Sequence, residues 1–199
     1  MKCRFALLFV GYFLCSTLQP QQMWPQTKPA PDSARVQSVE RKLQHLESNA
    51  AMPNPDPTPT EFTEEEINAY FSSGNFVFPA GVQSLVLQEQ PGVIVGTARI
   101  DFDQIKAGKN SYNPLLSVFS GLHDVVVNTH AHGEHGQGLV HVDSVMLDGV
   151  VLPDFVLELF VQKYLKPKYP NIGIDSHFAL PARAETATVG LHKVSLSQK

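Results

Sequence analysis

The residues of this chain best suited to chemistry lie close together in one stretch, THAHGEHGQG, at positions 129–138. Three histidines, His130, His132 and His135, are spaced around an acid, Glu134. Imidazole nitrogens and carboxylate oxygens are common zinc ligands, and a catalytic zinc site uses three protein ligands and keeps one position for water. The spacing therefore raises the hypothesis of a metal-dependent hydrolase.

The same ten residues resemble the T-H-x-H-x-D-H-x-G-G signature of the metallo-β-lactamase family. The threonine, the three histidines and the last glycine match, whereas Glu134 replaces the aspartate and Gln137 replaces a glycine. In that family the signature leads into a helix. Here residues 139–147, LVHVDSVML, alternate with period two, which indicates a strand. The resemblance is therefore judged coincidental, and we predict no catalytic residue and no cofactor.

We predict instead an antiparallel hairpin whose turn lies at residues 133–138. On its polar face the predicted pairs are His132–Leu139, His130–His141, Asn128–Asp143 and Val126–Val145. On its core face they are Ala131–Val140, Thr129–Val142, Val127–Ser144 and Val125–Met146. Because opposed side chains on a sheet come close to each other, His130, His132 and His141 are a candidate set of metal ligands. The alternative, which we prefer, is that they are solvent-facing imidazoles, so we predict no metal.

Residues 153–166, PDFVLELFVQKYLK, predict a helix that is apolar over most of its circumference. Such a helix needs cover on nearly every side. One interpretation is a central core helix. The other is that one flank lines a groove for a hydrophobic ligand, and for that flank we predict Phe155, Leu159, Phe160 and Tyr164 as the ligand-binding residues.

The N-terminus has the layout of a secretory signal. Lys2 and Arg4 precede an apolar run at residues 5–14, which is too short for a typical membrane span. We predict a signal peptide at residues 1–18 and a periplasmic or extracellular location. The alternative is an uncleaved N-terminus that would associate the chain with a membrane. Both cysteines lie in this segment, so the mature chain would have no disulfide framework.

Residues 19–60 predict a proline-rich tether, because spaced prolines favour extended chain and remove backbone donors. The prolines are Pro20, Pro25, Pro29, Pro31, Pro53, Pro55, Pro57 and Pro59. Within the tether, a short helix near residues 33–49 is predicted by apolar residues at helical spacing. These are Val36, Val39, Leu43 and Leu46.

The folded domain is expected at residues 61–199, and it begins with a capping-box pattern in which Thr63 and Glu66 start a helix. Two strand-like runs flank Gln90-Pro91-Gly92 and predict a hairpin. The last run, TATVGLHKVSL, predicts a C-terminal strand, and its apolar phase slips near His192, which indicates a bulge or burial on both faces. This order of elements predicts an α+β fold with helices packed on a curved, mostly antiparallel sheet.

The net charge of the chain and the motifs that it lacks exclude several classes of function. The 199-residue chain has a net charge of −4, which argues against a nucleic-acid partner because such proteins need a basic face. The sequence has no G-x-S-x-G elbow, no phosphate loop and no dinucleotide fingerprint. We therefore predict a protein that is not an enzyme.

The signal, the tether and the FTEEEINAYF start of the domain, followed by paired hairpins and apolar helices, resemble exported bacterial proteins of the tubular lipid-binding (TULIP-like) kind. The resemblance is one of element order over residues 61–199. It implies a curved sheet wrapped around a helix that holds a lipid. The expected function is binding of a lipid or another hydrophobic small molecule in the cell envelope. The alternative is an envelope structural or protein-interaction module with an unknown partner, and metal-dependent hydrolysis ranks last.

Overall fold

The computed structural model describes residues 32–106 and 114–199, so the predicted signal peptide and the first part of the tether lie outside the described residues. The described chain is α+β, which confirms the predicted fold class. Its elements are α1 (Ser33–Ala50), β1 (Thr60–Thr63), α2 (Glu64–Ser73), β2 (Val82–Gln90), β3 (Val93–Asp101), α3 (Phe102–Lys106), the 3-10 turn η1 (Pro114–Leu116), β4 (Leu122–Glu134), β5 (Gln137–Leu147), β6 (Val150–Val151), α4 (Asp154–Phe160), the π-helical η2 (Val161–Leu165), β7 (Asp175–Ala179), β8 (Ala184–Gly190) and β9 (Lys193–Gln198).

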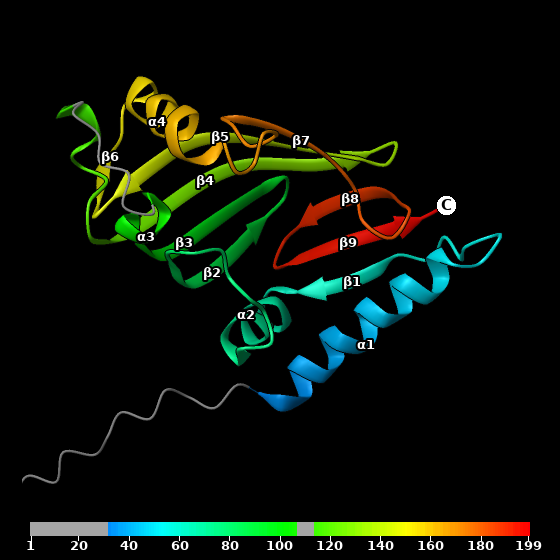
Figure 1. The fold of residues 1–199 in the computed structure, drawn as a ribbon. Helices are drawn as coiled ribbons and strands as arrows, with labels where there is room; N and C mark the ends of the chain where they lie inside the picture. The colour runs from blue at the N-terminus through cyan, green and yellow to red at the C-terminus, as the bar shows by residue number, and fades with distance from the viewer. Residues whose placement is uncertain (1–31, 107–113) are drawn as a thin grey trace, which may run out of the picture.

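The nine strands of the described chain belong to one sheet in which every pairing is antiparallel (Figure 1). The main path runs β1-β9-β8-β4-β3-β2, and β5 pairs with β4, β6 and β7 beside this path. The end strands β1 and β2 do not pair with each other, so the sheet is not closed. The long β4–β5 hairpin therefore joins two groups of strands, β2–β3 on one side and β1–β9–β8 on the other.

The predicted register of β4 and β5 is confirmed near the turn and is wrong farther from it. The confirmed pairs are His132–Leu139, Ala131–Val140, His130–His141 and Thr129–Val142. Beyond them a bulge at Asp143 shifts the register by one residue. The observed pairs there are Asn128–Ser144, Val127–Val145, Val126–Met146 and Val125–Leu147. The bulge is favoured because it turns the apolar Val145 and Leu147 into the core, where both are buried, in place of the predicted Ser144 and Met146.

The C-terminal run that we predicted as one strand is a hairpin of β8 and β9. The chain reverses at Leu191 and His192, and His192 has a φ of 54°, in the left-handed region. Reversal of the chain exchanges the face to which alternate residues point. The slip in apolar phase near His192 is therefore a turn and not a bulge, and the strand that follows it, β9, is half-buried on both faces.

α4 and η2 cover one end of the sheet and form the larger core with it. The core residues are Phe102, Leu116, Phe119, Val125, Val145, Leu147, Leu152, Val156, Phe160 and Tyr164. The rings of Phe119 and Phe160 stack with their centroids 4.2 Å apart. The opposite side of α4 is open, since Phe155 is 56% exposed. The expectation that this helix is covered on nearly every side is therefore wrong. No helix of the described ranges is long and apolar enough to cross a membrane.

α1 lies at the other end of the molecule, alongside β1 (Figure 1), and packs on α2, β1 and β9. The predicted helix near residues 33–49 is present, with Asp32 accepting a hydrogen bond from the backbone N–H of Ala34 as the cap, but it packs on the domain and is not part of an extended tether. Val39, Leu46 and Phe62 form a second, smaller core there. The predicted capping box of α2 is also present, with Thr63 and Glu66 bonding each other's backbone N–H.

Candidate functional site

An apolar cavity of about 440 Å³ lies between α1, α2 and the β1–β9 edge of the sheet. Its walls are Val39, Leu43, Leu46 and Glu47 from α1, Phe62, Val194 and Leu196 from the strands, Ile67, Tyr70 and Phe71 from α2, and Phe76, Pro181 and Ala182 from loops. Only Glu47 among them is charged. Leu43 and Phe76 are each 39% exposed, so the cavity opens to solvent between α1 and the segment after α2. Clefts of roughly 300–1,000 Å³ with apolar walls are typical of small-molecule sites.

Two sets of polar contacts hold α1 over this cavity. At its C-terminal end, the buried Asn49 donates to Gln198 Oε1 at 2.8 Å, and Gln198 donates in turn to the backbone oxygen of Leu46 at 2.8 Å. Nearer its middle, Lys42 Nζ lies 2.6 Å from a carboxylate oxygen of Glu66 on α2. Burial works against the charge of Glu66, but hydrogen bonds led by the one from Lys42 outweigh it and hold the pKa of Glu66 below its ordinary value. These contacts hold α1 against α2 and β9 and so position its wall of the cavity.

The four residues that the sequence suggested for ligand binding do not line one cavity. Phe160 and Tyr164 are buried in the core behind α4, where their ring centroids lie 5.2 Å apart. Phe155 and Leu159 are on the solvent side, where they border a shallow hollow together with Glu158 and Gln162. The sequence did contain a signal for the cavity found here. That signal was the apolar stripe of α1. Because α1 lies between proline-rich segments, we assigned it to the tether and not to the domain.

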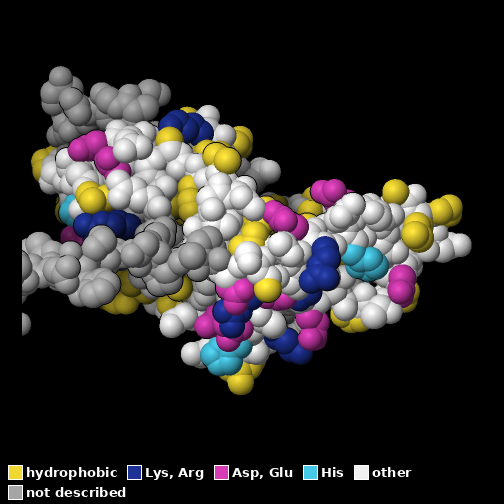
Figure 2. Space-filling model, turned by 90° about the horizontal axis from the view of Figure 1, so that it is seen from below, with side chains coloured by type: hydrophobic (Ala, Val, Ile, Leu, Met, Phe, Trp, Pro, Cys, Tyr) yellow, Lys and Arg dark blue, Asp and Glu magenta, His cyan; other side chains and the backbone are white. Residues whose placement is uncertain are grey.

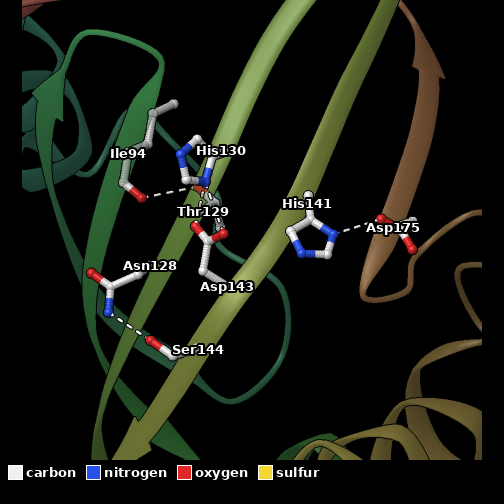
Figure 3. Close-up of polar contacts among 8 residues, drawn as sticks. All are labelled: Ile94, Asn128, Thr129, His130, His141, Asp143, Ser144 and Asp175. Atoms are coloured by element: carbon white, nitrogen blue, oxygen red, sulfur yellow. Dashed lines mark hydrogen bonds and ion pairs between the residues drawn. The ribbon is translucent and has the colours of Figure 1, made fainter.

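His130, His132 and His141 of the β4–β5 hairpin share the face opposite the core, and Figure 3 shows His130 and His141 on neighbouring strands. His130 Nδ1 is 2.8 Å from both carboxylate oxygens of Asp143, and His141 Nδ1 is 2.7 Å from Asp175 Oδ1. The hydrogen bond to Asp175 is the main reason why the pKa of His141 is raised. β7 adds His177 to this face, opposite Leu139, and the sequence had not placed it there. We call the set His130, His132, His141, His177, Asp143 and Asp175 the histidine face.

The glycines of this hairpin serve close packing. A Cβ on Gly133 would stand 2.7 Å from the Cβ of Ala187 on β8, and one on Gly138 would stand 2.5 Å from the ring of Phe178 on β7. His135 lies on the turn itself with a φ of 53°, and it does not border the hollow that His130 and His132 line. The three histidines of the hydrolase-like signature are therefore not gathered. Within residues 32–106 and 114–199, no group of three or more His, Cys, Asp or Glu side chains is close enough to hold a metal as the side chains stand.

A third polar feature is the carboxyl group of Glu89, which is fully buried at the end of β2. Both of its oxygens lack a hydrogen-bond partner in the described part of the chain. Burial, reinforced by the negative charge of Glu64, raises the pKa of Glu89 to about 7. Glu64 itself lies 2.9 Å from His192 Nδ1, and this hydrogen bond lowers the pKa of Glu64 and raises that of His192.

Comparisons with protein-family models, with curated proteins and with solved structures find no match. The class of the protein therefore rests on the fold, which is an open antiparallel α+β sheet with helices at its two ends. On the face seen from below in Figure 2, Lys and Arg side chains are interspersed with Asp and Glu, and hydrophobic side chains lie among them.

Proposed function

We propose that this chain is an exported, non-enzymatic protein that binds a lipid or another hydrophobic ligand, and that the cavity between α1 and α2 is the binding site. The observation that carries the proposal is the apolar wall of this 440 Å³ cavity. Each methylene that moves from water into such a site contributes about 0.8 kcal/mol. An apolar molecule with a single polar end therefore suits the cavity better than a polar metabolite does.

The way α1 is held supports the same proposal. The helix is attached through Lys42 in its middle and Asn49 at its end, while Leu43 between them borders the opening of the cavity. A site whose walls stand in place before the ligand arrives loses little conformational entropy on binding. The apolar surface exposed at Leu43 and Phe76 is the surface that a bound ligand would cover.

The test is to purify the protein, extract it with organic solvent and examine it by native mass spectrometry. We expect a co-purifying hydrophobic molecule in a one-to-one complex. Cis-parinaric acid, a fluorescent fatty acid, then serves as a probe of the emptied protein. A protein that carries no lipid and does not bind this probe saturably would contradict the proposal.

Two substitutions at positions of matched exposure locate the site. Leu43→Gln places an amide at the opening of the cavity, and we expect it to weaken probe binding about tenfold, as loss of one apolar side-chain contact implies. Leu159→Gln is the control, because Leu159 on α4 is 38% exposed and Leu43 is 39% exposed. If Leu159→Gln weakens binding and Leu43→Gln does not, the ligand lies on α4 and the assignment of the cavity is wrong.

The exposed side of α4 favours the alternative function, an envelope structural or protein-interaction module. Phe155 and Leu159 are one helical turn apart, and exposed apolar residues at that spacing are a common docking surface for another protein. Under this alternative, the protein carries no lipid. Crosslinking in cells would capture a partner that Leu159→Gln releases and Leu43→Gln retains.

A further inference from the structure

The histidine face brings four imidazoles and two carboxylates together from three neighbouring strands. In one cross-strand row, His130 on β4 lies opposite His141 on β5, which lies opposite Asp175 on β7. In the next row, His132 and His177 lie on either side of Leu139. Because residues two apart on a strand share a face, all of these side chains project to the same side of the sheet.

The four histidines and Asp175 border a hollow of about 170 Å³. It is well below the roughly 300–1,000 Å³ of sites for organic ligands, and it suits an ion with its water. The two carboxylates decide the sign of that ion. With neutral imidazoles, Asp143 and Asp175 carry two negative charges, which a divalent cation balances and an anion would increase.

The hydrogen bonds of the two central histidines match the arrangement seen around metal-binding imidazoles. His130 and His141 each direct Nδ1 toward an aspartate, at 2.8 Å and 2.7 Å. A carboxylate that accepts the Nδ1 proton selects the tautomer whose Nε2 is a free lone pair, and this makes that nitrogen a better ligand. Figure 3 shows both pairs on neighbouring strands, with His141 between His130 and β7.

The rings have the freedom to approach one another. The side chains of His130 and His141 are 63% and 54% exposed, so packing does not restrict their rotation. Directly opposed residues in an antiparallel pair have Cβ atoms only about 4.5–5.5 Å apart. His132 and His177 make no hydrogen bond within the described residues, and both are diagonal neighbours of His141. As the side chains stand, no three such groups within the described residues are close enough to hold a metal, so binding requires rotation about the side-chain bonds of these exposed rings.

We propose that the histidine face is a binding site for one divalent transition-metal ion of the zinc type. His130 and His141 are its central ligands through Nε2, and His132 and His177 complete the nitrogen shell. Asp143 and Asp175 orient the two central rings and balance the charge of the ion. The site lies on a different part of the sheet from the apolar cavity, so it stands or falls independently of lipid binding.

The test is calorimetric titration of the untagged chain with zinc chloride near neutral pH. We expect one saturable event with one ion per chain. His141→Gln should weaken the affinity at least tenfold, and Asp175→Ala should weaken it by about 10–100-fold, because loss of the orienting carboxylate typically has this effect. Circular dichroism establishes that each variant is folded. Imidazole must be neutral to bind a metal, so the affinity should also fall when the titration is repeated in mildly acidic buffer.

His135→Asn is the matched control. His135 belongs to the same hairpin and is exposed, but it lies on the turn away from the hollow, and asparagine tolerates its positive φ. We expect it to bind zinc as the parent chain does. Three results would each overturn the proposal: no saturable heat, several weak equivalent events that His141→Gln leaves unchanged, or equal loss of affinity in His135→Asn and His141→Gln.

Discussion

Glu89 is the residue whose replacement should change the stability of this protein most clearly with pH. Its carboxyl group is fully buried at the end of β2, both oxygens lack hydrogen-bond partners among the described residues, and its pKa is about 7. A carboxyl whose pKa is higher in the folded chain binds more protons there than in the unfolded chain between about pH 4.5 and 7. The free energy of unfolding therefore decreases as the pH rises through this interval.

The raised pKa also sets the size of the effect. A rise in the pKa of Glu89 from the ordinary 4.5 to about 7 corresponds to about 3 kcal/mol of lost stability once Glu89 is ionised, because each tenfold change in proton affinity is worth about 1.4 kcal/mol. Glutamine has nearly the same shape and never ionises. We expect Glu89→Gln to be more stable than the parent chain by about 3 kcal/mol near pH 8, and by less than about 1 kcal/mol near pH 5, where the folded carboxyl of the parent is still protonated.

The assay is urea unfolding of both chains at several values between about pH 5 and pH 8, with the difference in unfolding free energy plotted against pH. Glu65→Gln is the control, because Glu65 is exposed on the same side of the molecule, in the first turn of α2. Its difference from the parent should stay small at every pH. A difference for Glu89→Gln that is the same near pH 5 and near pH 8 would refute the argument that a buried charge is responsible.

Three further predictions concern the turn, the sheet and the core. The hydrogen bond to Glu64 raises the pKa of His192, so protonated His192 stabilises the fold at low pH, and this contribution is lost as the pH rises through the folded pKa. We therefore expect His192→Asn to lower the thermal unfolding temperature in mildly acidic buffer, and to lower it much less in alkaline buffer. Gly133→Ala should destabilise by about 1–3 kcal/mol because its Cβ would clash with β8, whereas Gly96→Ala, where the nearest atom is 3.5 Å away, should be tolerated. Phe119→Ala should lose about 3–5 kcal/mol in urea unfolding because the ring is fully buried, whereas Phe155→Ala, on the open side of α4, should lose little.

Each of these three has a result that would contradict it. Loss of stability in His192→Asn that is independent of pH would mean that the turn conformation, and not the charge, is what matters. Equal effects of alanine at the two glycines would remove the steric argument. A Phe155→Ala variant as unstable as Phe119→Ala would show that the outer side of α4 is covered.

Local patterns in the sequence were enough to predict the elements that depend on neighbouring residues. The capping box of Thr63 and Glu66 consists of bonds between residues three positions apart, so the sequence contains all of its determinants. The hairpin at Gln90-Pro91-Gly92 and the pairing of His130 with His141 follow in the same way from a turn and from period-two alternation. The α+β class followed from the order of these elements.

The rest was decided by contacts between parts of the chain far apart in sequence. The bulge at Asp143 exists because Val145 and Leu147 must reach a core that α4 supplies, and the local alternation continues through it without a break. α1 forms a wall of the apolar cavity because Asn49 bonds to Gln198, which is 149 residues away. Likewise, Glu89 is buried only because its strand pairs within the sheet. His177 lies beside the other histidines only because β7 pairs with β5. Propensity and spacing determine local shape, but burial and charge environment depend on which surfaces meet, and that is a property of the whole fold.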